Sequence, residues 1–228
     1  MNVTGTRTAL IEIDVQNDFC PAYGLSSGEK LPPGALAVDR GHEVIPPLNA
    51  LARALSGAGG RVIATADWHP RGHVSFASSH PGKKPGDTAE LSGEVQILWP
   101  DHCVQGTAGA AFHGELDLRP LSLILHKGFR RSLDSYSAFF ENDRRSPTGL
   151  EAYLRSLGVD TVLLGGLATD YCVLYSALDA AALGFTTLVL SDAVRGVGFP
   201  AGSVEAALDN MKSAGISLCP STGVTLGV

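Results

Sequence analysis

The apolar residues of the chain gather in five short runs in which most positions are hydrophobic. These runs cover residues 8–15, 61–66, 121–127, 161–168 and 186–193. Short runs that do not alternate between apolar and polar residues are typical of strands covered on both faces, as in parallel sheets. The pattern therefore predicts five buried strands, and the run at 215–220 is a candidate sixth.

The segments between these runs carry the spacing of amphipathic helices. Four helices are predicted, over residues 44–60, 149–158, 169–184 and 203–215. Their apolar residues recur about every 3.6 positions, and glycines stand where such helices commonly end. Strands that alternate with helices predict an α/β fold. We expect three αβα layers around a mostly parallel sheet of roughly six strands.

Length and composition favour one domain over residues 1–228. A hydrophobic fraction of 44% and a charged fraction of 18% are typical of a globular chain. The net charge of −6 argues against nucleic acid or an anionic membrane as the partner. We expect a small-molecule partner instead. The sequence does not indicate whether the protein is a monomer or a homo-oligomer.

The four cysteines are widely spaced, at positions 20, 103, 172 and 219, and form no CxxC pair. The first residues lack the charged and apolar regions of a signal peptide, and no apolar run is long enough to span a bilayer. We therefore expect reduced cysteines and a cytoplasmic protein.

Several reactive residue types fall where predicted strands end. In parallel α/β sheets the ligand site lies beyond the carboxyl ends of the strands, so Asp14, Lys127 and Cys172 are expected at one edge. The start of a helix and the cation of Lys127 would lower the pKa of Cys172 and favour a nucleophilic thiolate, with Asp14 to accept its proton. The alternative is structural: a buried small cysteine, a turn aspartate and a surface lysine.

A second group of polar residues follows the strand at 61–66. Asp67 and His69 are two positions apart, so in an extended chain both side chains face the same side. His102 and His73 would complete a set of nitrogen and oxygen donors that suits one divalent ion, Zn²⁺, Fe²⁺ or Mn²⁺. The alternative is that these histidines are solvated loop residues.

Five motifs together resemble the nicotinamidase/pyrazinamidase family of isochorismatase-like hydrolases. They are "DVQNDF" (14–19), "DWHP" with "HVSFA" (67–77), "WPDHCVQGTAGA" (99–110), "HKG" (126–128) and "GLATDYCV" (166–173). The motifs keep the order of the family, and the resemblance spans about residues 8–220. It implies hydrolysis of nicotinamide to nicotinate and ammonia, with pyrazinamide as a second substrate, in the salvage of NAD.

The resemblance also implies roles for the residues in these motifs. Asp14 would be the general acid and base, Lys127 its cationic partner, and Cys172 the nucleophile that forms a thioester. A cis peptide is implied between Leu167 and Ala168. The backbone N–H groups of Ala168 and Cys172 would then bind the oxyanion.

The same resemblance implies the metal and substrate contacts. Asp67, His69 and His102 match the family's metal ligands, and some members add a fourth residue, here His73, where others use water. The metal would orient the substrate through the ring nitrogen. The side chains implied for the substrate pocket are Phe19 and Trp99, which would sandwich the pyridine ring, with Tyr136 nearby.

Other functions remain open at this point. The first is another small-amide or carbamoyl hydrolase of the same superfamily, and the second is a vinyl-ether hydrolase of the isochorismatase type. A third is a metal-binding protein on this fold without catalytic activity, and a fourth is a redox sensor based on Cys172. The segment 20–41 resembles the family's loop only loosely.

Overall fold

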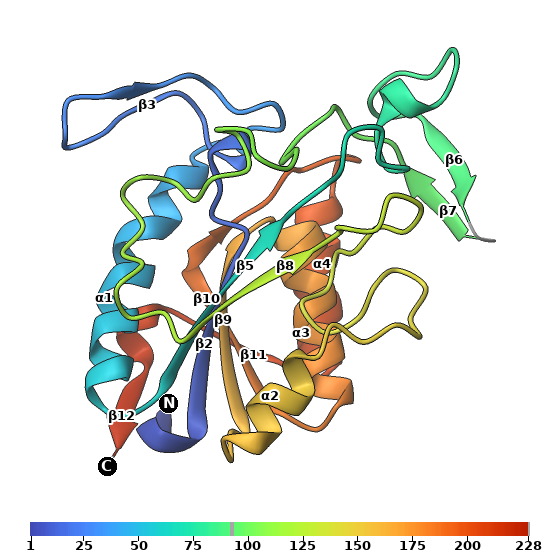
Figure 1. Ribbon diagram of the computed structural model, residues 1–228. Helices are drawn as coiled ribbons and strands as arrows, with labels where there is room; N and C mark the ends of the chain where they lie inside the picture. Colours follow the sequence, from blue (N-terminus) through green and yellow to red (C-terminus); the bar gives the residue numbers. More distant parts are fainter. Residues whose placement is uncertain (92–93, 228) are drawn as a thin grey trace.

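The computed structural model describes residues 1–91 and 94–227, and its centre is a sheet of six parallel strands (Figure 1). The strand order is β11 (Ser217–Cys219), β10 (Thr186–Arg195), β9 (Thr161–Leu167), β2 (Thr8–Ile13), β5 (Arg61–Asp67) and β8 (Leu123–Lys127). All six positions of β2 are buried, which is why its sequence does not alternate. The prediction of an α/β fold with six largely parallel strands is confirmed.

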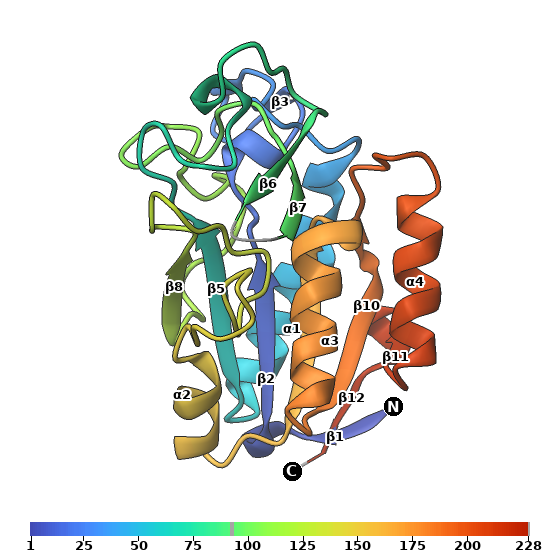
Figure 2. The same cartoon turned by 90° about the vertical axis from the view of Figure 1, so that its right-hand side faces the viewer.

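Helices cover both faces of this sheet (Figure 2). The helices are α1 (Ile45–Gly57) on one face and α2 (Leu150–Ser156), α3 (Leu174–Ala182) and α4 (Ser203–Ser213) on the other. Successive residues of a strand point to opposite faces. Leu10 of β2 accordingly packs in one core cluster with Leu48 of α1, and Ile11 packs in the other with Ala177 of α3. The expected three layers are therefore present.

Some local structure differs from the prediction. The helix expected over 169–184 begins with a π-helical turn, Thr169–Val173, in which the N–H of Val173 donates to the carbonyl of Ala168 (3.1 Å). Three two-stranded pairs were not predicted: β1 (Asn2–Thr4) with β12 (Thr225–Gly227), β3 (Tyr23–Gly24) with β4 (Lys30–Leu31), and β6 (Thr88–Leu91) with β7 (Glu94–Ile97). These strands are short, and none of them belongs to the central sheet.

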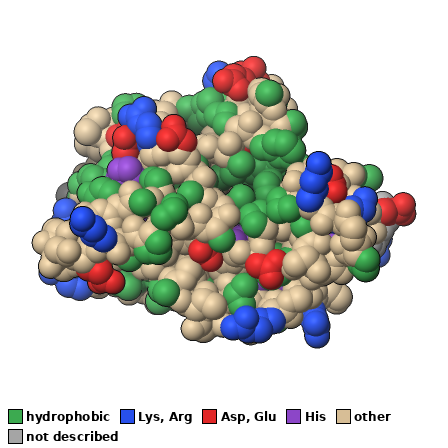
Figure 3. All heavy atoms as spheres, turned by 90° about the horizontal axis from the view of Figure 1, so that it is seen from above, with side chains coloured by type: hydrophobic (Ala, Val, Ile, Leu, Met, Phe, Trp, Pro, Cys, Tyr) green, Lys and Arg blue, Asp and Glu red, His purple; other side chains and the backbone are tan. Residues whose placement is uncertain are grey.

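The strands of the sheet end at one edge, over which the β3–β4 and β6–β7 hairpins lie, and both chain ends lie at the opposite edge (Figure 1). Viewed from above that edge, hydrophobic side chains surround a hollow (Figure 3). None of the helices in the described ranges has the length and apolar character needed to cross a membrane.

Candidate active site

A cavity opens at the carboxyl edge of the sheet. It encloses about 370 Å³ including its open mouth. Its lining comprises Phe19, Leu36, Asp67, His69, Trp99, His102, Asp134, Tyr136, Ala168, Tyr171, Cys172 and Val197. The cavity therefore suits a small ligand with an apolar body and a few polar contacts.

Cys172, Lys127 and Asp14 form one buried group beside this cavity. Lys127 Nζ lies 3.4 Å from Cys172 Sγ and 2.8 Å from Asp14 Oδ2. It also donates to the carbonyl of Ser135 (3.0 Å). Asp14 Oδ1 accepts a hydrogen bond from the hydroxyl of Thr65 (2.6 Å). The structure therefore brings these three side chains together, as the sequence predicts.

The ends of the strands put these groups in place. Asp14 follows β2 directly and has a φ of 50°, so the chain turns sharply where that strand ends. Lys127 is the last residue of β8 and pairs in register with Asp67, the last residue of β5. Cys172 lies in the π-helical turn that follows β9. Single π-helical turns are frequent at functional sites. The peptide bond between Leu167 and Ala168 is cis.

Burial and charge act on Cys172 in opposite directions. Burial raises the pKa of the thiol well above its usual value, and Asp14 and Asp67 act in the same direction. Lys127 lowers the pKa only in part. Burial therefore opposes the thiolate that the sequence predicts, and the thiolate stays a prediction.

Burial also raises the pKa of Asp14, with a further rise from Asp67, and Lys127 opposes both only in part. For Lys127, burial alone would lower the pKa, but the two carboxylates raise it well above its usual value. The lysine is consequently a fixed cation. Of the two carboxylates that share Lys127, Asp14 is the one whose pKa is raised, so it is the stronger base of the pair.

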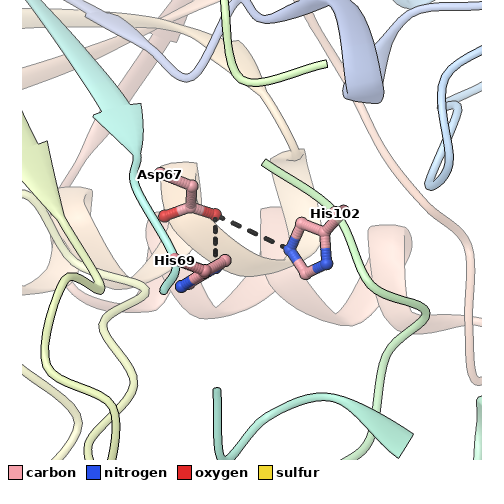
Figure 4. A group of neighbouring side chains, drawn as sticks. All are labelled: Asp67, His69 and His102. Carbon is pink, nitrogen blue, oxygen red and sulfur yellow. Dashed lines mark ion pairs between the residues drawn. The ribbon is translucent and has the colours of Figure 1, made fainter. Parts of the chain in front are cut away.

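Asp67, His69 and His102 form the second polar group in the cavity (Figure 4). One ligand atom from each lies within 4.8 Å of the others. Asp67 Oδ2 is 3.6 Å from His69 Nε2 and 3.9 Å from His102 Nε2. The other ring nitrogens, both Nδ1, bond to the carbonyls of Gly128 and Pro100 at 2.8 Å.

This arrangement fits a divalent metal. A metal-ligating histidine commonly donates its second N–H to a backbone carbonyl, which leaves the other nitrogen free to bind. Burial lowers the pKa of His102 to about 4, so its imidazole is neutral at pH 7 and can offer a lone pair. Burial would raise the pKa of Asp67, but Lys127 and His69 lower it below its usual value, so its carboxylate is ionised.

His73 does not join this group of three. Its Nδ1 lies 2.7 Å from the hydroxyl of Ser75 and its Nε2 3.3 Å from the carbonyl of Leu133. Its ring stacks on that of His69, with centroids 4.2 Å apart. A ligand atom of His73 instead lies within 4.8 Å of one from His69 and one from Asp134. His73 as a fourth metal ligand stays a prediction.

The three aromatic residues expected at the pocket all line the cavity. Trp99 Nε1 donates to the hydroxyl of Tyr136 (3.0 Å), and the ring of Phe19 meets that of His102 edge-on at 5.4 Å. Tyr171 also lines the cavity, and its ring packs edge-on against that of Trp99, with centroids 4.9 Å apart. These rings line the same cavity as the cysteine and the Asp/His group.

Four lining residues were not singled out from the sequence: Leu36, Asp134, Tyr171 and Val197. Tyr171 lies next to Cys172 in a motif that was recognised, so its position offered a signal. Asp134 and Val197 lie in long connections without periodicity. Leu36 lies in the segment that resembles the family only loosely. Nothing in the sequence indicated that these connections return to the cavity.

The fold and the site together define the class of the protein: an α/β protein with a parallel sheet and a buried Cys–Lys–Asp group at its carboxyl edge. The model of the isochorismatase domain matches residues 8–222, nearly the whole chain. The chain belongs to the isochorismatase family.

Several relatives within this family are similar over almost their full length. The nicotinamidase of Acinetobacter baylyi is 43% identical over 216 residues, which cover 95% of this chain and 94% of the relative. A solved nicotinamidase/pyrazinamidase from Acinetobacter baumanii has a TM-score of 0.87 and 44% identity, over 95% of this chain and 97% of that one. The pyrazinamidase of Pyrococcus horikoshii, solved in complex with zinc, has a TM-score of 0.72 and 35% identity over 94% and 99%.

Proposed function

We propose that this protein is a metal-dependent nicotinamidase, which hydrolyses nicotinamide to nicotinate and ammonia and pyrazinamide to pyrazinoate. The observation that carries the proposal is the contact of Cys172 Sγ with Lys127 Nζ, 3.4 Å, at a small cavity that also contains Asp67, His69 and His102. Relatives named nicotinamidase at over 40% identity support the substrate. The expected setting is the salvage of nicotinamide for NAD synthesis.

Asp67, His69 and His102 would hold one divalent metal ion, and zinc is supported by the zinc complex of the Pyrococcus horikoshii relative. Iron and manganese also suit these donors. When bound, the ion supplies a Lewis acid for the ring nitrogen of the substrate. Phe19, Trp99 and Tyr136 would hold the flat ring between apolar surfaces.

The first half of the reaction makes a thioester. Asp14 takes the proton from Cys172 Sγ, and the sulfur attacks the carboxamide carbon. Burial raises the pKa of Asp14, which makes it a stronger base toward the thiol than an ordinary carboxylate. The backbone N–H groups of Ala168 and Cys172 stabilise the oxyanion. Asp14 then gives its proton to the amide nitrogen, the C–N bond breaks, and ammonia leaves.

The second half releases the acid. Asp14 takes a proton from water, and the resulting hydroxide attacks the thioester carbon. The C–S bond breaks, and the sulfur recovers its proton from Asp14. Lys127 remains charged throughout and holds the carboxylates of Asp14 and Asp67 close to the sulfur. The cycle therefore ends with the same thiol and carboxylate from which it began.

Ammonia release from nicotinamide and from pyrazinamide tests this proposal. The purified protein is assayed as prepared, after chelation and after addition of zinc, iron or manganese, with Cys172→Ala and Asp14→Asn in parallel. We expect turnover that is lost on chelation, restored by at least one metal, and reduced about 10³-fold or more in both variants. A metal-loaded wild type that releases no ammonia from either amide would refute the nicotinamidase assignment.

A further inference from the structure

Asp134 is an acidic residue of the cavity wall that has no part in the mechanism above. Its side chain is buried, and it lies in the connection between β8 and α2. Asp134 Oδ1 accepts a hydrogen bond from the N–H of Ser135 (2.9 Å), and Oδ2 accepts one from Gln96 Nε2 of β7 (2.5 Å). Both donors fix the carboxylate in place without cancelling its charge.

The charge of Asp134 is not balanced in the way that the other two carboxylates are. Asp14 and Asp67 share the ammonium of Lys127, at 2.8 and 2.5 Å. Within residues 1–91 and 94–227, no lysine or arginine forms an ion pair with Asp134. One of its oxygens lies within 4.8 Å of a ring nitrogen of His69. The cavity wall therefore carries a carboxylate beside His69 that has no lysine or arginine partner among the described residues.

The substrate and the product of the proposed reaction differ in charge. Nicotinamide is neutral, whereas nicotinate carries a carboxylate at neutral pH. Two like charges in a protein interior repel each other more strongly than they do in water, because they are screened less. Asp134 consequently disfavours the product and leaves the binding of the substrate nearly unchanged.

We propose that Asp134 determines charge specificity in this cavity: it allows the neutral amide to bind and weakens the binding of the anionic acid. The product then dissociates readily and is a weak inhibitor of the enzyme. This proposal rests on the proposed function, because it takes the pyridine-3-carboxamide and its acid as the ligand pair. Asp134 acts through its charge and takes no part in bond making or breaking.

The test compares two ligands of the same shape and different charge. Dissociation constants of nicotinate and of 3-acetylpyridine, a neutral analogue, are measured by calorimetry on the metal-loaded protein, with metal content determined for each sample. In Asp134→Asn we expect nicotinate to bind about tenfold more tightly. The affinity for 3-acetylpyridine should stay within about twofold. The inhibition constant of nicotinate in the ammonia assay should fall in parallel.

Gln96→Met is the matched control, because it removes the hydrogen bond from Gln96 to Asp134 but keeps the charge. It should leave the ratio of the two dissociation constants unchanged. If both dissociation constants shift equally in Asp134→Asn, their ratio is unchanged and the inference is overturned. The proposed nicotinamidase activity would not be affected by that result. Loss of ammonia release in the wild type would instead remove the proposed function.

A measurement on the wild type covers the case in which Asp134→Asn does not fold. The cationic ligand 3-(aminomethyl)pyridine has the same ring and the opposite charge to nicotinate. We expect it to bind about tenfold or more tightly than nicotinate. Binding of nicotinate as tight as that of the cation would contradict the inference.

Discussion

At the scale of single residues, Lys127 forms ion pairs with both carboxylates nearest the sulfur of Cys172. It is fully buried and contacts Asp14, Asp67 and the sulfur of Cys172. Removing one partner of a buried ion pair is costly, because the remaining charge keeps its desolvation penalty without compensation. Here two carboxylates would lose the same partner.

Lys127→Met should therefore destabilise the protein as well as inactivate it. We expect the free energy of unfolding at pH 7 to fall by about 3–5 kcal/mol, measured by urea denaturation. Arg53→Met is the control, since Arg53 pairs with Asp117 at the surface (3.2 Å) and should cost at most about 1 kcal/mol. A loss below about 1 kcal/mol for Lys127→Met would contradict the charge balance described.

Glu12 is a second buried ionisable group, at the next-to-last position of β2. It is 0% exposed, and neither carboxylate oxygen has a hydrogen-bond partner among the described residues. Burial, with a smaller contribution from Asp117, raises its pKa to about 8. The folded protein therefore holds this proton more tightly than the unfolded chain, in which the pKa is near 4.5.

The sign of the pH effect follows from this difference. Stability from the protonated Glu12 is fully present below pH 4.5 and is lost as the pH rises toward 8. We expect Glu12→Gln to gain about 3 kcal/mol relative to wild type between pH 5 and pH 8, measured by urea denaturation at several pH values. Glu205→Gln, on the exposed face of α4, should show no such trend. A parallel pH profile for Glu12→Gln and wild type would refute the shift.

At the scale of elements, Asp170 joins the turn that carries Cys172 to the loop before α4. Its carboxylate accepts hydrogen bonds from the N–H groups of Val197 and Gly198, both at 2.9 Å, and from the hydroxyl of Ser203 (2.6 Å). Val197 lines the cavity. One side chain thus links the turn that contains Cys172 to the segment that contains Val197.

Asp170→Ala leaves two backbone N–H groups without their partner and frees the loop. We expect a loss of about 2–3 kcal/mol in the free energy of unfolding and a fall of about tenfold or more in kcat/KM. Ser203→Ala removes only one of the three donors and should cost about 1 kcal/mol. Urea denaturation and steady-state kinetics on nicotinamide measure both effects. Equal effects of the two substitutions would show that the amide contacts contribute nothing.

At the scale of the whole molecule, one sheet supports both core clusters. Leu10 and Ile11 are neighbours in β2 yet belong to the clusters on opposite faces. Neither face can lose its packing while β2 stays in place, so we predict that residues 1–228 form one folding unit. Calorimetry of the metal-free protein should give a single transition with equal calorimetric and van't Hoff enthalpies. Two separate transitions would refute a single domain.

Much of the fold and part of the site could be predicted from the sequence. The runs at 8–15 and 161–168 lie in the middle of the sheet, where burial on both faces favours apolar residues at most positions. Asp14, Lys127 and Cys172 follow strands that are adjacent or nearly so, and parallel strands end at one edge. Their meeting therefore follows from chain order and sheet direction. The hairpins β3–β4 and β6–β7 were missed because their strands are too short to show a period.

The sequence by itself determined the strands, the helices, the edge at which the chemistry gathers and the residue types found there. Only the tertiary structure decided that burial raises the pKa of Cys172, that both nitrogens of His73 have protein partners, and that Asp134 returns to the cavity wall. The reason is physical. Periodicity reports which faces of the chain are buried, whereas a pKa or a ligand geometry depends on distances of a few ångströms between residues far apart along the chain.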